Sequence, residues 1–557
     1  MIRHGGRIRS AAGTAVALTA VLSLTLSGCG DGAADGSGES SGTGGVDRAS
    51  VGSAERSATP GPASPSPSRV YPLSKPPATI PAVRSHTAAR GPGWRPAPGA
   101  GVALAPGSEE LADEARLLAR ELKLDYRGTA AARGGDVELV LDPDAATGPA
   151  PAAPAGAVGP ESYTLTTADN RVRVVAPAEA GVFYGTRTLK QAVRSGGAMP
   201  EGVVRDGPDR PQRGLMVDTA RKFFDGAWIE ARLREAADLK INQFGLHFSD
   251  DQGFRIESDT HPGIVSRQHL TKAEVRRIVA LADSLHITVI PEIDSPGHLG
   301  AVLAKYPGLQ LKDVTGRAVP GAVDIGNPAA GELVDELLRE YAELFPGAYW
   351  HLGGDEYQAL TRRDPEASFP ALAARAREEY GPDGRIKDLA TAWVNERAKA
   401  LRPGGRTLKA WNDGYFRGGE TAVDQDIQVE YWTGKEIGAR PPVEYLAEGR
   451  PVVNLNDEYL YYVLGEPNDF DYPTGRRIYE QWTPLVLRGT EPVPARYSRQ
   501  ILGGRFAVWC DFSRAQTPEQ IARGIALPLR ATAQKLWDPR TPSRSWQEFR
   551  TLAQRLG

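Results

Sequence analysis

From residue 213 onward the chain repeats one pattern, in which a short apolar run ends in polar residues and a stretch with helical spacing follows. The runs predict strands at 214–218, 243–248, 288–293, 349–353, 407–411, 428–431, 452–455 and 506–508. The clearest helical stretches are 227–239, 272–285, 331–344 and 518–535. Strands that alternate with helices in this way predict a (β/α)8 barrel over residues 208–557, with a doubly wound sheet as the competing architecture.

Polar and aromatic side chains gather where these predicted strands end. They are Asp218, Arg221, His247, Asp250, Asp251, Asp294, His298, Asp355, Glu356, Asn412, Asp413, Trp432, Asn456, Asp457, Tyr459, Trp509 and Asp511. In a barrel all the carboxyl ends meet at one mouth, where active sites lie. In an open sheet most of these groups would be far apart. Their placement therefore favours the barrel and predicts a functional site at its mouth.

Residues 97–207 predict a small α+β domain in front of the barrel. Apolar residues at helical spacing cover 109–122, strand patterns cover 137–141, 163–167 and 172–175, and a turn and helix follow at 181–192. This segment carries no cluster of titratable residues, so we expect it to have a supporting role.

The first residues have the pattern of a secretory signal. Three arginines precede an apolar run at 15–26, which is shorter than the roughly 20 residues that span a bilayer. The run ends in Leu26-Ser27-Gly28-Cys29, which resembles a bacterial lipobox. We therefore expect residues 1–28 to be a lipoprotein signal, Cys29 to be lipidated, and the protein to be secreted and anchored to the cell membrane by lipid only. An ordinary secretory signal that contains a cysteine is the alternative.

Residues 29–96 are expected to be a disordered stalk. Between 31 and 80, 35 of 50 residues are Gly, Ala, Ser, Thr or Pro. Such a segment cannot bury enough apolar surface to offset the entropy lost on ordering.

Charge and cysteine content exclude several classes of protein. The formal net charge is −3, which argues against a nucleic-acid partner because such proteins usually carry a basic excess. The chain has only two cysteines, so a disulfide framework and a cysteine-rich zinc site are both excluded. The second, Cys510, lies in an apolar run and is expected to be a buried free thiol.

The segment from His351 to Glu356, with the sequence His-Leu-Gly-Gly-Asp-Glu, is the sharpest chemical feature. Its two glycines relax the backbone at the end of a predicted strand, and Asp355 and Glu356 follow directly. Two carboxylates this close raise one pKa, and a carboxylic acid held protonated near neutral pH is suited to general acid catalysis. An acidic surface loop is the usual interpretation of an Asp-Glu pair, but the glycines and the polar strand ends favour an active site.

Aromatic residues at the same mouth indicate the kind of ligand. Trp411, Trp432 and Trp509 lie at or just after strand ends, and Tyr459 lies nearby. Together they would form an apolar box around a small group or a sugar face. Arg221 could bind hydroxyl groups by charge-assisted hydrogen bonds. Aromatic walls, an arginine and paired carboxylates predict a carbohydrate site.

These residues resemble the β-N-acetylhexosaminidases of glycoside hydrolase family 20. The matching segments run from Arg213 to Arg221, from His247 to Ile256, from Pro291 to His298 and from His351 to Glu356. The resemblance covers roughly residues 100–557 and includes the small α+β domain. It implies a glycosidase that removes a terminal β-linked N-acetylglucosamine or N-acetylgalactosamine from oligo- or polysaccharides. It also implies substrate-assisted retaining catalysis, in which the 2-acetamido group of the sugar is the nucleophile.

The resemblance implies a role for each residue of the reacting centre. Glu356 would protonate the leaving oxygen and then activate water, and Asp355 would hold the acetamido nitrogen. Tyr459 would donate a hydrogen bond to the acetamido oxygen. Asp250 and His298 would form a relay that orients the catalytic glutamate.

The resemblance also implies how the rest of the sugar is held. Trp411, Trp432 and Trp509 would wall the acetamido pocket and support the ring, and Arg221 would bind the outer hydroxyls. No cofactor is implied. His298 is not expected to bind a metal, because no motif with ligand spacing accompanies it.

Two departures from the family pattern affect the outer edge of the sugar. Many members have Tyr-x-Asp after the seventh strand, whereas this chain has Tyr459-Leu460-Tyr461. After the eighth strand a glutamate is common, and here Asp511 follows Trp509 and Cys510. The preferred sugar and linkage therefore stay open.

Two other interpretations of the site remain. One is a carbohydrate-binding lipoprotein that is catalytically idle, which the presence of both Asp355 and Glu356 disfavours. The other is a glycosidase that uses a protein nucleophile, for which the N-acetyl group of the substrate would be dispensable.

Overall fold

The computed structural model describes residues 70–145, 159–435, 439–466 and 471–557. The predicted signal at 1–28, Cys29 and the stalk up to residue 69 lie outside these ranges. Within the described ranges, no helix has the length and apolar character needed to cross a membrane.

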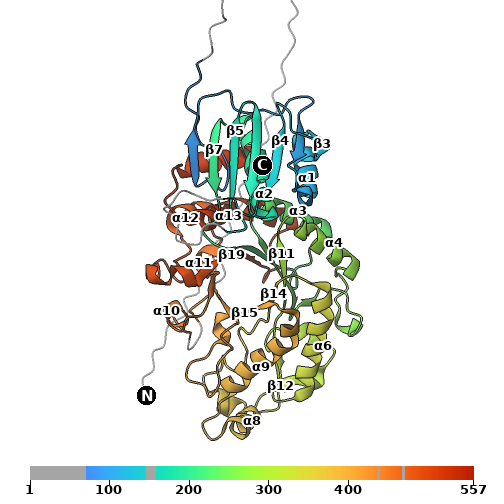
Figure 1. Ribbon diagram of the computed structural model, residues 1–557. Helices are drawn as coiled ribbons and strands as arrows, with labels where there is room; N and C mark the ends of the chain where they lie inside the picture. Colours follow the sequence, from blue (N-terminus) through green and yellow to red (C-terminus); the bar gives the residue numbers. More distant parts are fainter. Residues whose placement is uncertain (1–69, 146–158, 436–438, 467–470) are drawn as a thin grey trace, which may run out of the picture. The chain divides into compact units, whose positions relative to one another are not determined.

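Eight parallel strands form a closed barrel, which confirms the predicted fold and excludes the open sheet (Figure 1). Each strand pairs with the next, and the last pairs with the first to close the ring. The barrel strands are β8 (Gln212–Asp218), β9 (Gln243–Asp250), β11 (Thr288–Ile293), β14 (Tyr349–His351), β15 (Thr407–Trp411), β16 (Gln428–Tyr431), β17 (Val452–Asn454) and β19 (Ile501–Trp509).

Helices follow the barrel strands and pack their apolar faces on them. Local sequence sets where several begin, since Thr271 and Thr517 form capping boxes at their N-termini. The longer helices are α3 (Gly226–Asp238), α4 (Lys272–Asp283), α6 (Pro328–Leu344), α8 (Pro370–Tyr380), α9 (Ile386–Leu401), α13 (Pro518–Trp537) and α14 (Trp546–Leu556). The shorter ones are α5 (Gly300–Leu303), α7 (Pro365–Ser368), α10 (Pro442–Ala447), α11 (Asp457–Leu460) and α12 (Gly475–Gln481).

In the described part of the barrel domain, four short strands lie outside the ring. β10 (Gly253–Phe254) is antiparallel to β9, and β12 (Gln310–Lys312) forms a hairpin with β13 (Ala318–Val323). β18 (Tyr461–Val463) lies parallel to the carboxyl end of β19, after the short helix α11. This last strand brings an additional segment of chain to the mouth of the barrel.

A seven-stranded mixed sheet with two helices precedes the barrel, as the sequence predicted in outline. Its strand order is β1-β7-β5-β6-β4-β2-β3. The helix α2 (Glu179–Gly196) packs on β4, β5 and β6 and also contacts α3 and α14 of the barrel. The strands are β1 (Ser85–Ala88), β2 (Gly101–Leu104), β3 (Asp125–Gly128), β4 (Val137–Leu141), β5 (Tyr163–Ala168), β6 (Arg171–Ala176) and β7 (Gly202–Asp206), and the second helix is α1 (Ala112–Leu122).

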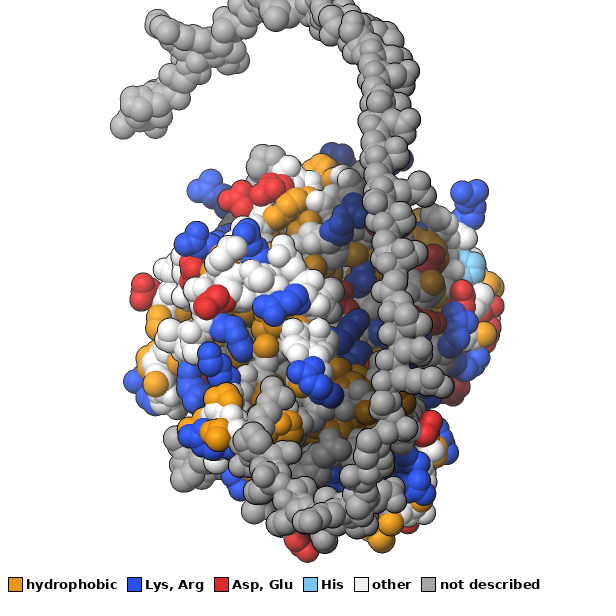
Figure 2. Space-filling view, turned by 90° about the horizontal axis from the view of Figure 1, so that it is seen from above, with side chains coloured by type: hydrophobic (Ala, Val, Ile, Leu, Met, Phe, Trp, Pro, Cys, Tyr) orange, Lys and Arg blue, Asp and Glu red, His pale blue; other side chains and the backbone are white. Residues whose placement is uncertain are grey.

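The other face of this sheet meets solvent. In β6 the exposed Arg171 and Arg173 alternate with the buried Val172 and Val174, and Arg173 forms an ion pair with Glu138 at 3.0 Å. Figure 2 shows basic, acidic and apolar side chains interspersed on the face seen from above. This mixed character fits the small net charge of the chain.

The folded part begins before residue 97, so the predicted stalk extends too far. β1 pairs with β7, and Trp94 is fully buried, with its indole N–H donating to the carbonyl of Gly135 at 2.7 Å. Ile80 is also fully buried. Prolines and alanines separate these apolar residues in the sequence, so no helical or strand period marks them, and only tertiary pairing holds them in place.

A buried ion pair joins the small domain to the barrel. Asp206 of β7 lies 3.1 Å from the Lys240 ammonium, which follows α3, and neither side chain is exposed. Tyr163 and Trp537 also donate hydrogen bonds to Asp206, at 2.6 and 2.9 Å. The Lys240 ammonium lies 4.2 Å from the centre of the Trp537 ring. Each partner therefore offsets the cost of burying the others.

Replacing Asp206 with alanine should lower the free energy of unfolding by about 3–5 kcal/mol, because it leaves Lys240 buried without its carboxylate. Denaturant unfolding followed by tryptophan fluorescence measures the change. Asp125→Ala, at an exposed position of β3, is the matched control and should stay close to wild type. Equal stability of the two variants would contradict the role assigned to this ion pair.

Candidate functional site

A cavity of 510 Å³ opens at the carboxyl ends of the barrel strands, where the sequence predicted a site. Its walls combine carboxylates, two histidines, an arginine and large aromatic rings. The lining residues are Arg221, His247, Asp250, Asp294, His298, Asp355, Glu356, Trp411, Trp432, Thr433, Lys435, Tyr461, Val463, Trp509 and Asp511. The predicted site residues thus lie together, with the exception of Tyr459 and of Cys29, which is outside the described ranges.

The backbone after β14 adopts an unusual conformation that directs two carboxylates into the cavity. Gly353 and Gly354 have φ of +74° and +101°, and Glu356 has φ of +45°. A Cβ atom on Gly353 would overlap the carboxylate of Asp294, so only glycine fits there. The N–H of Gly354 donates to Asp294 at 3.0 Å. For a residue with a side chain, such as Glu356, the left-handed conformation costs roughly 1–3 kcal/mol, which the surrounding contacts must offset.

The two neighbouring carboxyl groups have opposite electrostatic environments. Burial, together with the nearby carboxylate of Asp294, raises the pKa of Asp355 well above its usual value. Glu356 is nearly half exposed, and the imidazole of His298, 3.4 Å away, lowers its pKa. The sequence predicted one raised pKa in this pair. The structure assigns it to Asp355 and not to Glu356, the expected acid, because Asp355 is the buried member.

His298 is held between acidic groups on both sides. Its Nδ1 lies 3.3 Å from Asp250, and its Nε2 lies 3.6 Å from Asp355 in addition to its contact with Glu356. Burial alone would lower the pKa of His298, but these carboxylates raise it well above the usual value. These carboxylates therefore favour the protonated form of the ring. Asp250, His298 and Glu356 form the chain of contacts that the sequence analysis expected.

Asp250 is itself held by two further cationic partners. It accepts a hydrogen bond from His247 at 2.8 Å and pairs with Arg221 at 2.9 Å. Although burial opposes this, these partners and His298 hold the pKa of Asp250 below its usual range. The carboxylate form of Asp250 is therefore favoured beside His298.

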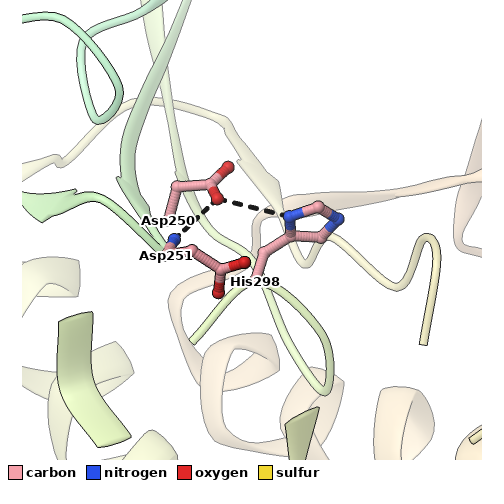
Figure 3. Close-up of side chains that lie close together, drawn as sticks. All are labelled: Asp250, Asp251 and His298. Atoms are coloured by element: carbon pink, nitrogen blue, oxygen red, sulfur yellow. Dashed lines mark hydrogen bonds and ion pairs between the residues drawn. The ribbon is translucent and has the colours of Figure 1, made fainter. Parts of the chain in front are cut away.

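Figure 3 shows Asp250 between the ring of His298 and the backbone nitrogen of Asp251. Oxygen and nitrogen atoms of these three side chains lie within 4.8 Å of one another, a spacing that could suit a cation. However, Asp251 accepts a hydrogen bond from the N–H of Gly300 at 2.9 Å, and its own N–H donates to Asp250 at 2.6 Å. With the ion pair between Asp250 and Arg221, these contacts fix the carboxylate that holds the ring of His298.

Aromatic rings also line the cavity. Trp432 is stacked on Tyr461, with 5.7 Å between the ring centres and 4° between the planes. The ring centre of Trp509 lies 5.9 Å from that of Trp411 and 5.8 Å from that of Tyr461. The indole N–H of Trp411 donates to Glu292 at 2.7 Å, which sets the orientation of that ring. The result is an apolar box beside the two carboxyl groups.

Tyr461, and not the predicted Tyr459, supplies the tyrosine of this box. Tyr459 belongs to α11, is buried, and packs under the guanidinium of Arg477 at 4.2 Å. The sequence predicts that Tyr459 lies at the mouth because it closely follows the strand. The structure instead places Tyr459 in the short helix α11, which separates β17 from Tyr461. Tyr461 begins β18, and the alternation of side chains along a strand places Val463 in the cavity and Tyr462 on the other side. In a strand, every second side chain points to the same side. A strand assigned to Tyr461-Tyr462-Val463 would therefore have placed Tyr461 and Val463 together in the cavity.

With Tyr461 in the cavity, the departure from the Tyr-x-Asp pattern after the seventh strand lies at a different residue. The segment with the Tyr-x-Asp position is Tyr461-Tyr462-Val463, so valine stands where an aspartate was expected. Asp511 does line the cavity, and burial raises its pKa. Asp294 was recognised only as a polar strand end, and the structure adds its contact with the Gly353-Gly354 turn. Lys435 also lines the cavity, but it lies in a loop, and no sequence pattern indicates that it belongs to the site.

Two family profiles match the chain. "Glycosyl hydrolase family 20, catalytic domain" matches residues 211–540, and "Glycosyl hydrolase family 20, domain 2" matches residues 76–207. The first covers the barrel and the second covers the small domain with its N-terminal strand.

Individual proteins show the same similarity. The Lacto-N-biosidase of Bifidobacterium bifidum is 29% identical over 487 residues, which are 86% of this chain and 42% of that protein. A Beta-hexosaminidase of Porphyromonas gingivalis is 27% identical over 68% of this chain and 51% of its own. The chain thus spans about half the length of these relatives. The structure of the GH20 beta-N-acetylhexosaminidase from Streptomyces coelicolor has the same fold, with a TM-score of 0.67, 24% identity, and coverage of 86% of this chain and 95% of that one.

Proposed function

The chain belongs to glycosyl hydrolase family 20, and on this basis we propose that it hydrolyses the bond between a terminal β-linked N-acetylhexosamine and the remainder of an oligo- or polysaccharide. The observation that carries the proposal is the aromatic box of Trp411, Trp432, Trp509 and Tyr461 directly beside Asp355 and Glu356. A box of this kind suits the methyl group of an acetamide, and its polar members suit the amide atoms.

The first step would use the substrate's own acetamido oxygen as the nucleophile. This oxygen attacks C1 while Glu356 gives its proton to the leaving oxygen. Burial and Asp294 raise the pKa of Asp355, which disfavours the free carboxylate that a route with a protein nucleophile would need. A nucleophile held inside the substrate also gains the large effective molarity of an intramolecular reaction.

Asp355 would stabilise the intermediate. It accepts a hydrogen bond from the acetamido N–H, and the positive charge that develops on this nitrogen favours the ionised form of Asp355. Tyr461 would donate its hydroxyl hydrogen to the acetamido oxygen and hold it below C1. In the second step the Glu356 carboxylate takes a proton from water, the water oxygen attacks C1, and the acetamide is restored.

Glu356 must carry a proton for the first step although His298 lowers its pKa in the free protein. Its carboxyl group is nearly half exposed and so accessible to water before substrate binds. A sugar that covers this carboxyl group removes water, and desolvation raises its pKa toward the donating form. The same relay of Asp250 and His298 then stabilises the carboxylate that remains after donation. An idle sugar-binding protein has no need for this arrangement.

Release of a disaccharide is a second candidate function, which Val463 favours. An aspartate at this position would bind an outer hydroxyl of a terminal sugar, whereas valine offers no hydrogen bond. Beyond the cavity, the ring of Phe512 is 54% exposed and packs over Gly465. An exposed aromatic ring next to Asp511 provides a platform for a second sugar attached to the outer edge of the first.

Wild-type protein should release 4-nitrophenol from the N-acetyl-β-D-glucosaminide and not from the plain β-glucoside, because the acetamide is the nucleophile. Glu356→Gln should lower kcat by about 10²-fold or more, since it removes the general acid and base. Glu343→Gln, exposed on α6, is the matched control. Equal rates on both aryl glycosides would contradict substrate assistance, and sugar binding without any release would support the idle protein.

The same assay decides between the two candidate products. A third aryl glycoside carries a disaccharide with N-acetylglucosamine at the aryl end. If this compound alone releases 4-nitrophenol, and the disaccharide appears as product, the second candidate replaces the first. Release from the monosaccharide glycoside supports the first.

Tyr461→Phe should lower kcat on the N-acetyl substrate by about 10²-fold, as expected when one donor to a developing charge is removed. Tyr459→Phe should stay near wild type, because its ring packs under Arg477 outside the cavity. Steady-state kinetics of both variants, with thermal unfolding to confirm folding, measures the difference. A greater loss in the Tyr459 variant would restore the prediction made from the sequence.

We also propose that Cys29 is lipidated after removal of residues 1–28 and anchors the protein to the outer side of the cell membrane. The lipobox-like sequence before Cys29 supports this. Two acyl chains or more would provide firm anchoring, since each buried CH₂ contributes about 0.8 kcal/mol.

Cys29→Ser should move the protein from the membrane fraction of an expressing bacterium into the medium or the soluble extracytoplasmic fraction. Immunoblots of the fractions, and mass spectrometry of the N-terminal peptide of the wild type, measure this. Wild-type protein that is soluble and carries no lipid on Cys29 would show that the signal is an ordinary one.

A further inference from the structure

We propose that Asp413 is a positioning residue for both the general acid and the cavity wall. It holds the backbone of Glu356, and it fixes the orientation of the Trp432 ring. This inference rests on the proposed glycosidase function. Asp413 follows β15 in a short turn at 412–414 and does not line the main cavity.

The carboxylate of Asp413 bridges the two strands that flank its own. One oxygen accepts a hydrogen bond from the backbone N–H of Glu356 at 2.9 Å, in the loop after β14. The other accepts from the indole N–H of Trp432 at 3.0 Å, directly after β16. β15 pairs with both β14 and β16 in the barrel. One side chain on the central strand therefore couples the loops on either side.

The bond to Glu356 acts on a backbone that is held in an unfavourable conformation. Glu356 is one of few residues with a side chain and positive φ among the described ranges. Gly354 is held by Asp294 on one side, and Glu356 is held by Asp413 on the other. In this conformation the Glu356 carboxylate lies 3.4 Å from His298. Without Asp413, the backbone of Glu356 can relax to negative φ, and the carboxylate then turns away from His298 and the reacting bond.

The bond to Trp432 sets the rotation of its ring. The backbone N–H of Trp432 donates to Asn412 at 2.8 Å, so adjacent residues hold the backbone and the indole. In this orientation the ring lies parallel to Tyr461. Asp413 thus couples the acid and the acetamido wall, and its loss should affect proton donation as well as substrate binding.

Proton donation and binding can be separated by the leaving group. An aryl glycoside with a basic leaving group, such as 4-methoxyphenol, needs protonation by Glu356, whereas 2,4-dinitrophenol leaves with little help. If Asp413 positions the acid, Asp413→Ala should lower kcat/KM on the 4-methoxyphenyl substrate at least about tenfold more than on the 2,4-dinitrophenyl substrate. Both substrates carry the sugar that the wild type accepts.

Three further variants complete the test. Asp413→Asn retains one acceptor oxygen and should show an intermediate difference between the substrates. Trp432→Phe removes the indole donor and shortens the stacked ring but keeps the bond from Asp413 to Glu356, so it should raise KM on both substrates alike. Asp426→Asn, at an exposed position before β16, is the control and should match wild type. Thermal unfolding shows whether each variant is folded.

An equal loss on both substrates in a folded Asp413→Ala variant would overturn the proposal, since Asp413 would then support the loop without acting on the acid. If Asp413→Ala does not fold, the same comparison with Asp413→Asn decides, and equal losses there overturn the proposal. Failure of the proposed function gives a different result, because the wild type itself then releases no phenol from either substrate.

Discussion

The close approach between Gly353 and Asp294 is the constraint on which the site depends. The strand β14 ends where its backbone meets the Asp294 carboxylate, and a Cβ atom at Gly353 would occupy the same space. The turn that follows uses Asp294 as a hydrogen-bond acceptor and has positive φ at Gly353, Gly354 and Glu356. This geometry buries Asp355 against Asp294 and leaves Glu356 at the open side. The different environments of two consecutive carboxyl groups thus follow from one backbone path.

Beneath this turn, buried charged groups in the barrel hold the side chains of the cavity. Glu292 accepts a hydrogen bond from Trp411 and lies 3.1 Å from His247 and 3.2 Å from His351. Although burial opposes it, Glu292 and Asp250 raise the pKa of His247 to about 10, so this ring is a cation. Glu292 therefore supports the aromatic wall and the relay to His298 at once. Such groups are costly to bury alone, and pairing makes them a rigid support that needs no rearrangement during reaction.

The fold and much of the site could be predicted because both follow from local patterns. Apolar runs of four to eight residues with helices between them indicate barrel strands, and a barrel brings their polar ends together. The predictions that were wrong concern residues held by tertiary contacts. Trp94 is buried by a sheet that forms around it, and no period in the sequence marks it. Tyr461 lies beyond a short helix, so the distance from the end of β17 did not indicate which tyrosine returns to the cavity.

The distribution of protons in the site could not be predicted from the sequence either, and it bears on how the enzyme would work. An adjacent Asp-Glu pair indicates that one pKa is raised but not which one, because the sequence does not show which side chain is buried. In the structure, burial and Asp294 raise the pKa of Asp355, whereas His298 lowers the pKa of Glu356. The proposed catalysis needs the opposite balance, with a proton on Glu356 and a negative charge near the acetamide. An N-acetylated substrate would favour this change, because its ring would desolvate Glu356 and its developing cation would stabilise the Asp355 carboxylate. A ligand that lacks the acetamide would do only the first of these, so under the proposed mechanism the electrostatics of the site would favour N-acetylated sugars.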